Sequence, residues 1–129
     1  MAFGTSITVD QPFDEALAAT REVLARQGFG VLTEIDMQAT MKNKLGEEYA
    51  PFVILGACNP NFAHQALGVD PSVATLLPCN VVVREEGGAV EISTLDPQLL
   101  VQATGTDELA PLAGQLTDLL AAAFADLAT

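Results

Sequence analysis

The chain has 129 residues, half of them hydrophobic, which is the usual size of one domain with its own core. Its 17 acidic residues against 5 basic residues give a net charge of −12. This sign argues against nucleic acid and anionic membrane surfaces as partners, because both bind clustered Lys and Arg. The apolar runs are too short to span a bilayer, and no basic segment leads into an apolar one at the start, so we expect a cytoplasmic protein.

The first part of the chain predicts a strand followed by a helix. Ser6 to Val9 is a short β-type run, and Asp10-Gln11-Pro12 supplies a cap and a proline suited to the first helical turn. Residues of one helical face follow at the expected spacing: Phe13, Ala16, Leu17, Thr20, Val23 and Leu24. Glu22 and Arg26 are spaced to pair on the outer face, and Gly28 is expected to end the helix in a left-handed conformation.

A second strand and a short helix come next. Alternation from Phe29 to Met37 predicts a strand with Phe29, Val31, Thr33, Ile35 and Met37 on one face and Leu32, Glu34 and Asp36 on the other. Gln38 to Leu45 predicts a short helix stopped by Gly46. The continuous apolar run from Phe52 to Ala57 is typical of a strand covered on both faces.

The middle of the chain predicts two short helical segments. Asn59-Pro60 begins a helix that runs to about Leu67 and is closed by Gly68. Asp70-Pro71 opens a further turn of helix that ends near Leu77.

A hairpin and a long helix complete the predicted elements. Asn80 to Glu85 and Ala89 to Leu95 are strands joined at Glu86-Gly87-Gly88, and Asp96-Pro97 breaks the sheet. From about Asp107 to Leu127 a helix, capped by Thr106 or Asp107, carries one apolar stripe: Leu109, Leu112, Leu116, Leu119, Leu120, Ala123 and Leu127. This order lacks regular β-α-β alternation, so we expect one α+β domain, a mostly antiparallel sheet with helices packed on one face.

Two cysteines are too few for the disulfide framework of a small secreted protein, so they are expected as free thiols, a redox pair or a metal-ligand pair. Cys58 ends a buried strand just before a helix, where unpaired N–H groups and the helix dipole favour a thiolate. The plainer interpretation is that Asn59 caps the helix, Pro60 begins it, and Cys58 is a small buried apolar residue.

Leu77-Pro78-Cys79-Asn80 is the second Cys-Asn segment, and here the cysteine enters a strand rather than leaving one. If the strands of Cys58 and Cys79 are antiparallel neighbours, both thiols lie at the same end of the sheet; if they are parallel, the thiols lie at opposite ends. A disulfide would need Cα atoms within about 7 Å of each other, which the sequence does not fix.

His64 is the only histidine and follows Cys58 by less than two helical turns, so it faces either back toward the thiol or away from it. A Cys–His pair can form a nucleophile, and His64 with both cysteines could supply three ligands of zinc or iron. Neither cysteine lies in a C-x-x-C pair, so the metal signal is weak. The plainer interpretation of His64 is an ordinary, partly exposed helix residue.

Glu34 and Asp36 are two apart on one strand and place their carboxylates near each other. Such a pair can act in acid–base chemistry or bind a hard cation. The plainer interpretation, which we favour, is a solvated strand face with Asp36 capping the following helix. The sequence contains no Gly-rich phosphate loop, dinucleotide fingerprint or nucleophile elbow, which argues against most nucleotide-dependent enzymes, and it indicates no particular cofactor.

The chain resembles the domain-of-unknown-function family 302, small bacterial and archaeal proteins. The resemblance covers most of the chain and lies in segments that follow one another in order: Phe29 to Asp36, Ile54 to Pro60 with Ala63-His64 and Ala66-Leu67, Leu76 to Val83, and Asp96-Pro97. It implies a β-α-β-β-β-β-α order with a curved antiparallel sheet and short extra helices, often in a homodimer. It implies no activity and carries no catalytic residue onto this sequence.

The sequence supports three hypotheses for the function. The first, which we rank highest, is a homodimeric module that binds a small molecule or a protein in the cradle of the sheet, with Cys58, Asn59, Cys79 and Asn80 at its rim. The second is a thiol-based activity, such as sulfur transfer, redox sensing or metal handling, with Cys58 reactive and Cys79 resolving or co-ligating. The third is a homodimeric scaffold in which the Cys-Asn segments serve packing alone.

Overall fold

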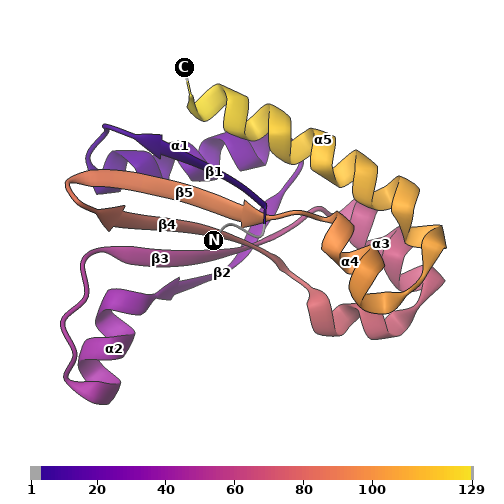
Figure 1. The fold of residues 1–129 in the computed structure, drawn as a ribbon, viewed down its shortest axis with the longest axis horizontal. Helices are drawn as coiled ribbons and strands as arrows, with labels where there is room; N and C mark the ends of the chain where they lie inside the picture. The colour runs from indigo at the N-terminus through magenta and orange to yellow at the C-terminus, as the bar shows by residue number, and fades with distance from the viewer. Residues whose placement is uncertain (1–3, 129) are drawn as a thin grey trace.

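The computed structural model describes residues 4–128 as one open sheet with helices on one side (Figure 1). All strand pairs are antiparallel, and the order across the sheet is β1-β5-β4-β3-β2. The strands are β1 (Gly4–Val9), β2 (Gly30–Asp36), β3 (Phe52–Cys58), β4 (Cys79–Glu86) and β5 (Ala89–Leu95). The predicted α+β class and the antiparallel sheet are therefore confirmed.

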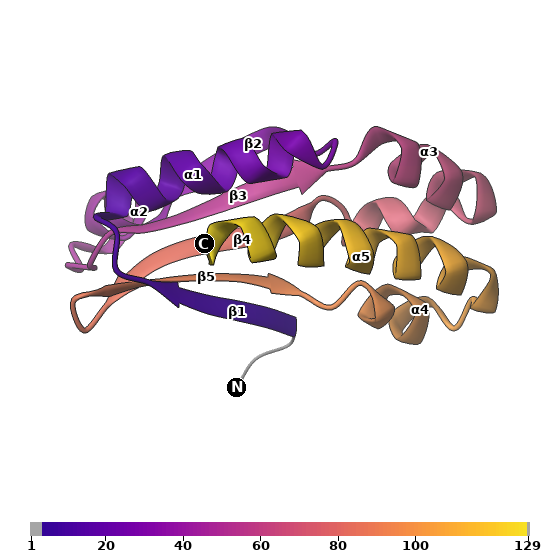
Figure 2. The same ribbon diagram turned by 90° about the horizontal axis from the view of Figure 1, so that it is seen from above.

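Two long helices, α1 (Phe13–Arg26) and α5 (Ala110–Leu127), lie side by side over one face of the sheet (Figure 2). The shorter segments α3 (Pro60–Val69), η1 (Pro71–Leu76), α4 (Gln98–Thr104) and η2 (Asp107–Leu109) gather beyond one end of the strands, and α2 (Met37–Leu45) lies at the other end (Figure 1). Within residues 4–128, no helix has the length and apolar character needed to cross a bilayer.

The core lies between the sheet and these two helices. Alternate residues of the three inner strands are buried against the helices: Val53, Leu55, Ala57, Val81, Val83, Val90 and Ile92. The buried stripe of α5 matches the predicted one, except that Leu119 is only partly buried and that Ala113 and Phe124 are buried as well. Burying each of the larger aliphatic side chains contributes about 1.5–3 kcal/mol, so this layer supplies most of the stability of the fold.

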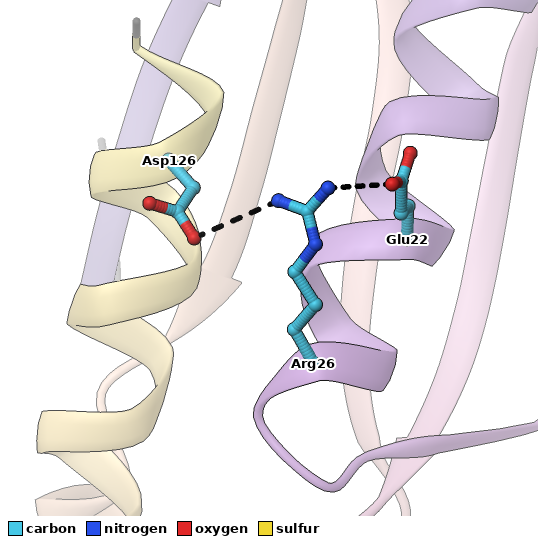
Figure 3. A network of polar contacts seen from close by, with 3 residues as sticks. All are labelled: Glu22, Arg26 and Asp126. Atoms are coloured by element: carbon cyan, nitrogen blue, oxygen red, sulfur yellow. Dashed lines mark hydrogen bonds and ion pairs between the residues drawn. The ribbon is translucent and has the colours of Figure 1, made fainter.

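An exposed ion-pair network also joins the two long helices (Figure 3). Arg26 of α1 donates to Glu22 one turn earlier, as predicted, and lies 4.0 Å from a carboxylate oxygen of Asp126 on α5. All three side chains are about half exposed, so water screens these contacts and each contributes little to stability.

The predicted strand alternation is wrong in the first half of β2. The register shifts between Val31 and Thr33, so the extra residue Leu32 forms a bulge. Val31 is paired with Ala57 on the helix-covered face, whereas Thr33 is paired with Gly56 on the open face. Counting alternate residues cannot reveal such a bulge, because it depends on the pairing with β3.

The start of α1 differs from the prediction, whereas its end agrees with it. Pro12 precedes the helix instead of occupying its first turn, and no side chain caps the first N–H groups. Gly28 has a positive φ of 83°, and the N–H of Phe29 bonds to the carbonyl oxygen of Leu24. The left-handed glycine at the helix end is therefore confirmed.

Later helix boundaries also differ from the prediction. Gly68 lies inside α3, which ends at Val69, so it does not close the helix. The segment after Asp96-Pro97 forms the unpredicted helix α4, whose first turn is held by a 2.9 Å hydrogen bond from Gln98 N to Asp96 Oδ1. The long C-terminal helix is preceded by the short η2. The side chain of Thr106 forms no capping hydrogen bond at the start of η2.

The prediction that the third strand is covered on both faces is wrong. On the open face, Ile54 of β3 lies between Ile35 of β2 and Val82 of β4 in directly paired positions. These cross-strand neighbours leave Ile54 half-buried on the face opposite the core. The apolar run of β3 therefore reflects its central place in the sheet.

Candidate functional site

The two Cys-Asn segments meet at the end of the sheet next to α3. Because β3 and β4 are antiparallel, Ala57 lies opposite Cys79 and Gly56 lies opposite Asn80. The end of one Cys-Asn segment is thus beside the start of the other, which is the antiparallel arrangement considered from the sequence.

The two cysteines nevertheless occupy different faces of the sheet. Cys79 shares the helix-covered face with Ala57, and strand alternation places Cys58, the next residue along, on the open face. Both are free thiols; Cys79 is 4% exposed, and Cys58 is half-buried. Burial, with a smaller contribution from Cys58, raises the pKa of the Cys79 thiol to about 11. Cys79 therefore stays protonated at neutral pH, which makes it a weak nucleophile.

Asn59 joins α3 to the end of α1. Its Oδ1 accepts a hydrogen bond from Phe62 N at 3.2 Å, and its Nδ2 lies 3.5 Å from the carbonyl oxygen of Gln27. The predicted N-cap and the proline in the first helical turn are confirmed. Asn59 is buried, so its amide serves the geometry of this junction.

His64 is exposed on α3, outside the buried face formed by Phe62, Ala63 and Ala66. Among residues 4–128, no three or more His, Cys, Asp or Glu side chains are grouped so that they could hold a metal ion. The structure thus does not gather His64 and the two cysteines into one ligand set.

Glu34 and Asp36 lie on the same face of β2, the face turned toward α1. Glu34 forms an ion pair with Arg21 of α1. Asp36 Oδ1 accepts a 2.9 Å hydrogen bond from Ala39 N and caps α2. The capping role considered for Asp36 is confirmed, and both carboxylates have partners within the fold.

Across the open face, the chemistry changes from apolar to polar. One row of paired residues runs from Ile35 through Ile54 and Val82 to Ser93 and Ser6. Along this row the side chains on β2 and β3 are therefore apolar, whereas those on β5 and β1, the polar half of the face, carry hydroxyl groups.

A depression of about 380 Å³ lies in the polar half. Its main side chains come from three adjacent strands: Ser6, Asn80, Val82, Arg84, Glu91 and Ser93. Asn80 is the only one of the residues singled out from the sequence that lines it. Asn80 is exposed there, while its carbonyl oxygen accepts a 3.0 Å hydrogen bond from Thr94 Oγ1.

Arg84 is the basic group of this depression. Its guanidinium bonds to Glu86 at 2.8 Å and to Glu91 at 3.2 Å. The hydrogen bond to Glu86 is the main cause that raises the pKa of Arg84, so the guanidinium stays charged. Arg84 and Ser93 were not among the residues predicted from the sequence, although alternation along the predicted hairpin would have placed both on the face of Asn80.

The comparisons with known proteins agree on one family. Residues 5–127 match the family described as "Domain of unknown function DUF302". A crystal structure of an uncharacterized conserved protein DUF302 from Bacillus stearothermophilus has a TM-score of 0.87 and 31% sequence identity, covering 95% of this chain and 96% of that one. None of the curated proteins matches the chain. The chain therefore belongs to the DUF302 family, whose domain has no assigned function.

Proposed function

We propose that the chain is a homodimeric binding module that receives a small polar ligand on the open face of its sheet. The observation that carries this proposal is the depression between β1, β5 and β4. Its volume of about 380 Å³ is in the range of small-molecule sites. Hydroxyl, amide and guanidinium groups converge there on a rigid sheet, and such groups can orient a polar ligand.

A thermal-shift screen with small polar metabolites tests the ligand part of this proposal. A bound compound stabilises the folded state, so it raises the melting temperature by an amount that grows with its free concentration relative to its Kd. Ser93→Trp fills the depression and should abolish the shift. Ala121→Trp, on the exposed side of α5, is the matched control and should keep it. The proposal fails if no compound stabilises the protein, or if the shift survives Ser93→Trp.

The homodimer part of the proposal is supported by apolar side chains near the β2 edge. Four of the large hydrophobic residues exposed in residues 4–128 lie on β2, on α2 or just after it: Leu32 (67%), Ile35 (45%), Leu45 (69%) and Tyr49 (40%). Exposed apolar side chains on and near an edge strand favour association with a second copy.

Native mass spectrometry tests the dimer. The wild-type protein should have twice the chain mass, and Ile35→Lys should shift it to the monomer. Leu67→Lys on α3, where the side chain is 37% exposed, is the matched control and should remain dimeric. A monomeric wild-type mass contradicts the proposal.

The alternative is a thiol-based activity, and one observation favours it: Cys58 is half-buried rather than sealed, directly before the start of α3. It requires Cys58 to act without a readily ionised partner, because the Cys79 thiol is buried and has a raised pKa. Alkylation of the native protein across a pH series, with mass spectrometry to locate the label, distinguishes the two functions. Labelling of Cys58 well below about pH 8.5 supports the thiol function, whereas labelling only after unfolding rejects it.

A further inference from the structure

A second groove lies away from the open-face depression, between the first turns of α1, the end of β2 and the start of β3. Its volume is about 410 Å³. Four apolar side chains form part of its lining: Phe13, Leu17, Phe52 and Val53. Three carboxylates line it as well, from Asp14, Glu34 and Asp36, and no Lys or Arg does. The groove therefore combines apolar surface with three carboxylates, and Arg21, which pairs with Glu34, is not part of its lining.

The order of charged residues along α1 and β2 explains why negative charge gathers at this groove. Farther along α1, Arg21 supplies the cation that pairs with Glu34. Asp14 lies two helical turns before Arg21, on the same side of the helix, and Asp36 lies two residues beyond Glu34 on the same side of the strand. The Arg21–Glu34 ion pair thus bridges α1 and β2. Nearer the start of α1 and the end of β2, the same sides of these elements carry the carboxylates of Asp14 and Asp36.

We propose that this groove binds an organic cation with an apolar stem, with a primary ammonium group beside Asp14 and Asp36 and the stem on Phe13 and Leu17. An ammonium group has three donors for carboxylate oxygens, and burial of its stem gains hydrophobic free energy. A metal ion fits less well, because apolar side chains would replace the oxygen ligands that hard cations need. An anion is repelled by a chain of net charge −12.

This proposal stands apart from the open-face function, because the two hollows share no lining residue. Hexylammonium, hexanol and hexanoate are linear six-carbon compounds with a positive, neutral or negative head group, so they separate charge from apolar contact. Each is titrated into the full chain at low salt while backbone amide signals are followed by NMR. We expect shifts at Phe13, Leu17 and Val53, with hexylammonium binding about tenfold more tightly than hexanol and hexanoate not binding.

A variant that replaces one carboxylate of the groove with a neutral amide tests where the compound binds. Asp14→Asn should weaken hexylammonium binding about threefold and leave hexanol unchanged, because one partly exposed ion pair is lost. Asp118→Asn, on the exposed side of α5, changes the net charge equally and should leave both affinities unchanged. The proposal is overturned if hexylammonium and hexanol bind equally, if the shifts lie outside the groove, or if both variants weaken hexylammonium alike.

Discussion

The side chain of Thr33 on β2 occupies the space above Gly56 on β3 where a side chain at that position would lie. A Cβ at Gly56 would overlap Thr33 Oγ1 and lie 2.9 Å from Cγ of Pro78, so the position requires glycine for close packing. We expect Gly56→Ala to destabilise the fold by about 1–3 kcal/mol, measured by urea denaturation, because Thr33 and Pro78 must shift.

Gly68→Ala is the control for this substitution. Gly68 lies within α3, and a Cβ at this position would point into open space, with no neighbouring side chain within 4 Å. Alanine there should therefore stabilise the protein by about 0.5–1 kcal/mol. Adding Thr33→Ala to Gly56→Ala should recover part of the loss. Equal effects at Gly56 and Gly68 would contradict the packing relationship.

The contact between Thr33 and Gly56 also shows which features the sequence alone does not predict. Elements marked by local signals were predictable: α2 ends at Gly46 with φ 70°, and the hairpin turns at Gly87 and Gly88 with φ 59° and 82°. The bulge at Leu32 was not, because it is fixed by the partner strand. Asp96-Pro97 indicates a break in the sheet, but an Asp followed by Pro also begins a helix such as α4, and the dipeptide alone does not distinguish the two.

The candidate site was predictable to a similar extent. Antiparallel neighbours bring the two Cys-Asn segments to one end of the sheet, and that possibility was visible in the sequence. Which face each cysteine takes depends on the register, which pairs Cys79 with Ala57 instead of Cys58. The depression around Arg84 depends on β1 joining β5, a contact between distant parts of the chain that no local pattern encodes.

Asn59 should matter for stability through its two hydrogen bonds. Asn59→Ala removes the cap on Phe62 N and the contact to the Gln27 carbonyl, so we expect a loss of about 1–2 kcal/mol in the free energy of unfolding. Asn61→Ala on the exposed side of α3 is the matched control, since the side chain of Asn61 has no hydrogen bond within residues 4–128. A loss of similar size in both variants would contradict the capping role.

Cys79 should make stability depend on pH in the alkaline range. Its pKa is raised in the folded state from 9.0 to about 11, so the folded protein holds this proton more tightly than the unfolded chain. The resulting stabilisation is fully present below pH 9 and is lost as the pH rises through about 11. We expect a decline on the order of 2 kcal/mol across this interval, measured by denaturation at each pH.

Cys79→Ala tests the assignment, because other groups titrate in the same interval. The variant should be less stable at pH 7, where a buried side chain has been shortened, and should show a smaller decline toward pH 11. An unchanged decline in the variant would mean that Cys79 is not its source.

Apolar packing, rather than the ion-pair network of Figure 3, should hold α5 in place. Leu120 is 4% exposed within the core, so Leu120→Ala should cost about 2–5 kcal/mol in the free energy of unfolding. Arg26→Met keeps the apolar stem and removes the contacts to Glu22 and Asp126, and it should cost less than about 1 kcal/mol. That small cost should shrink further in 1 M salt, where the Debye length is about 3 Å. If Arg26→Met proves as damaging as Leu120→Ala, the two helices depend on charge, and the order of these contributions is reversed.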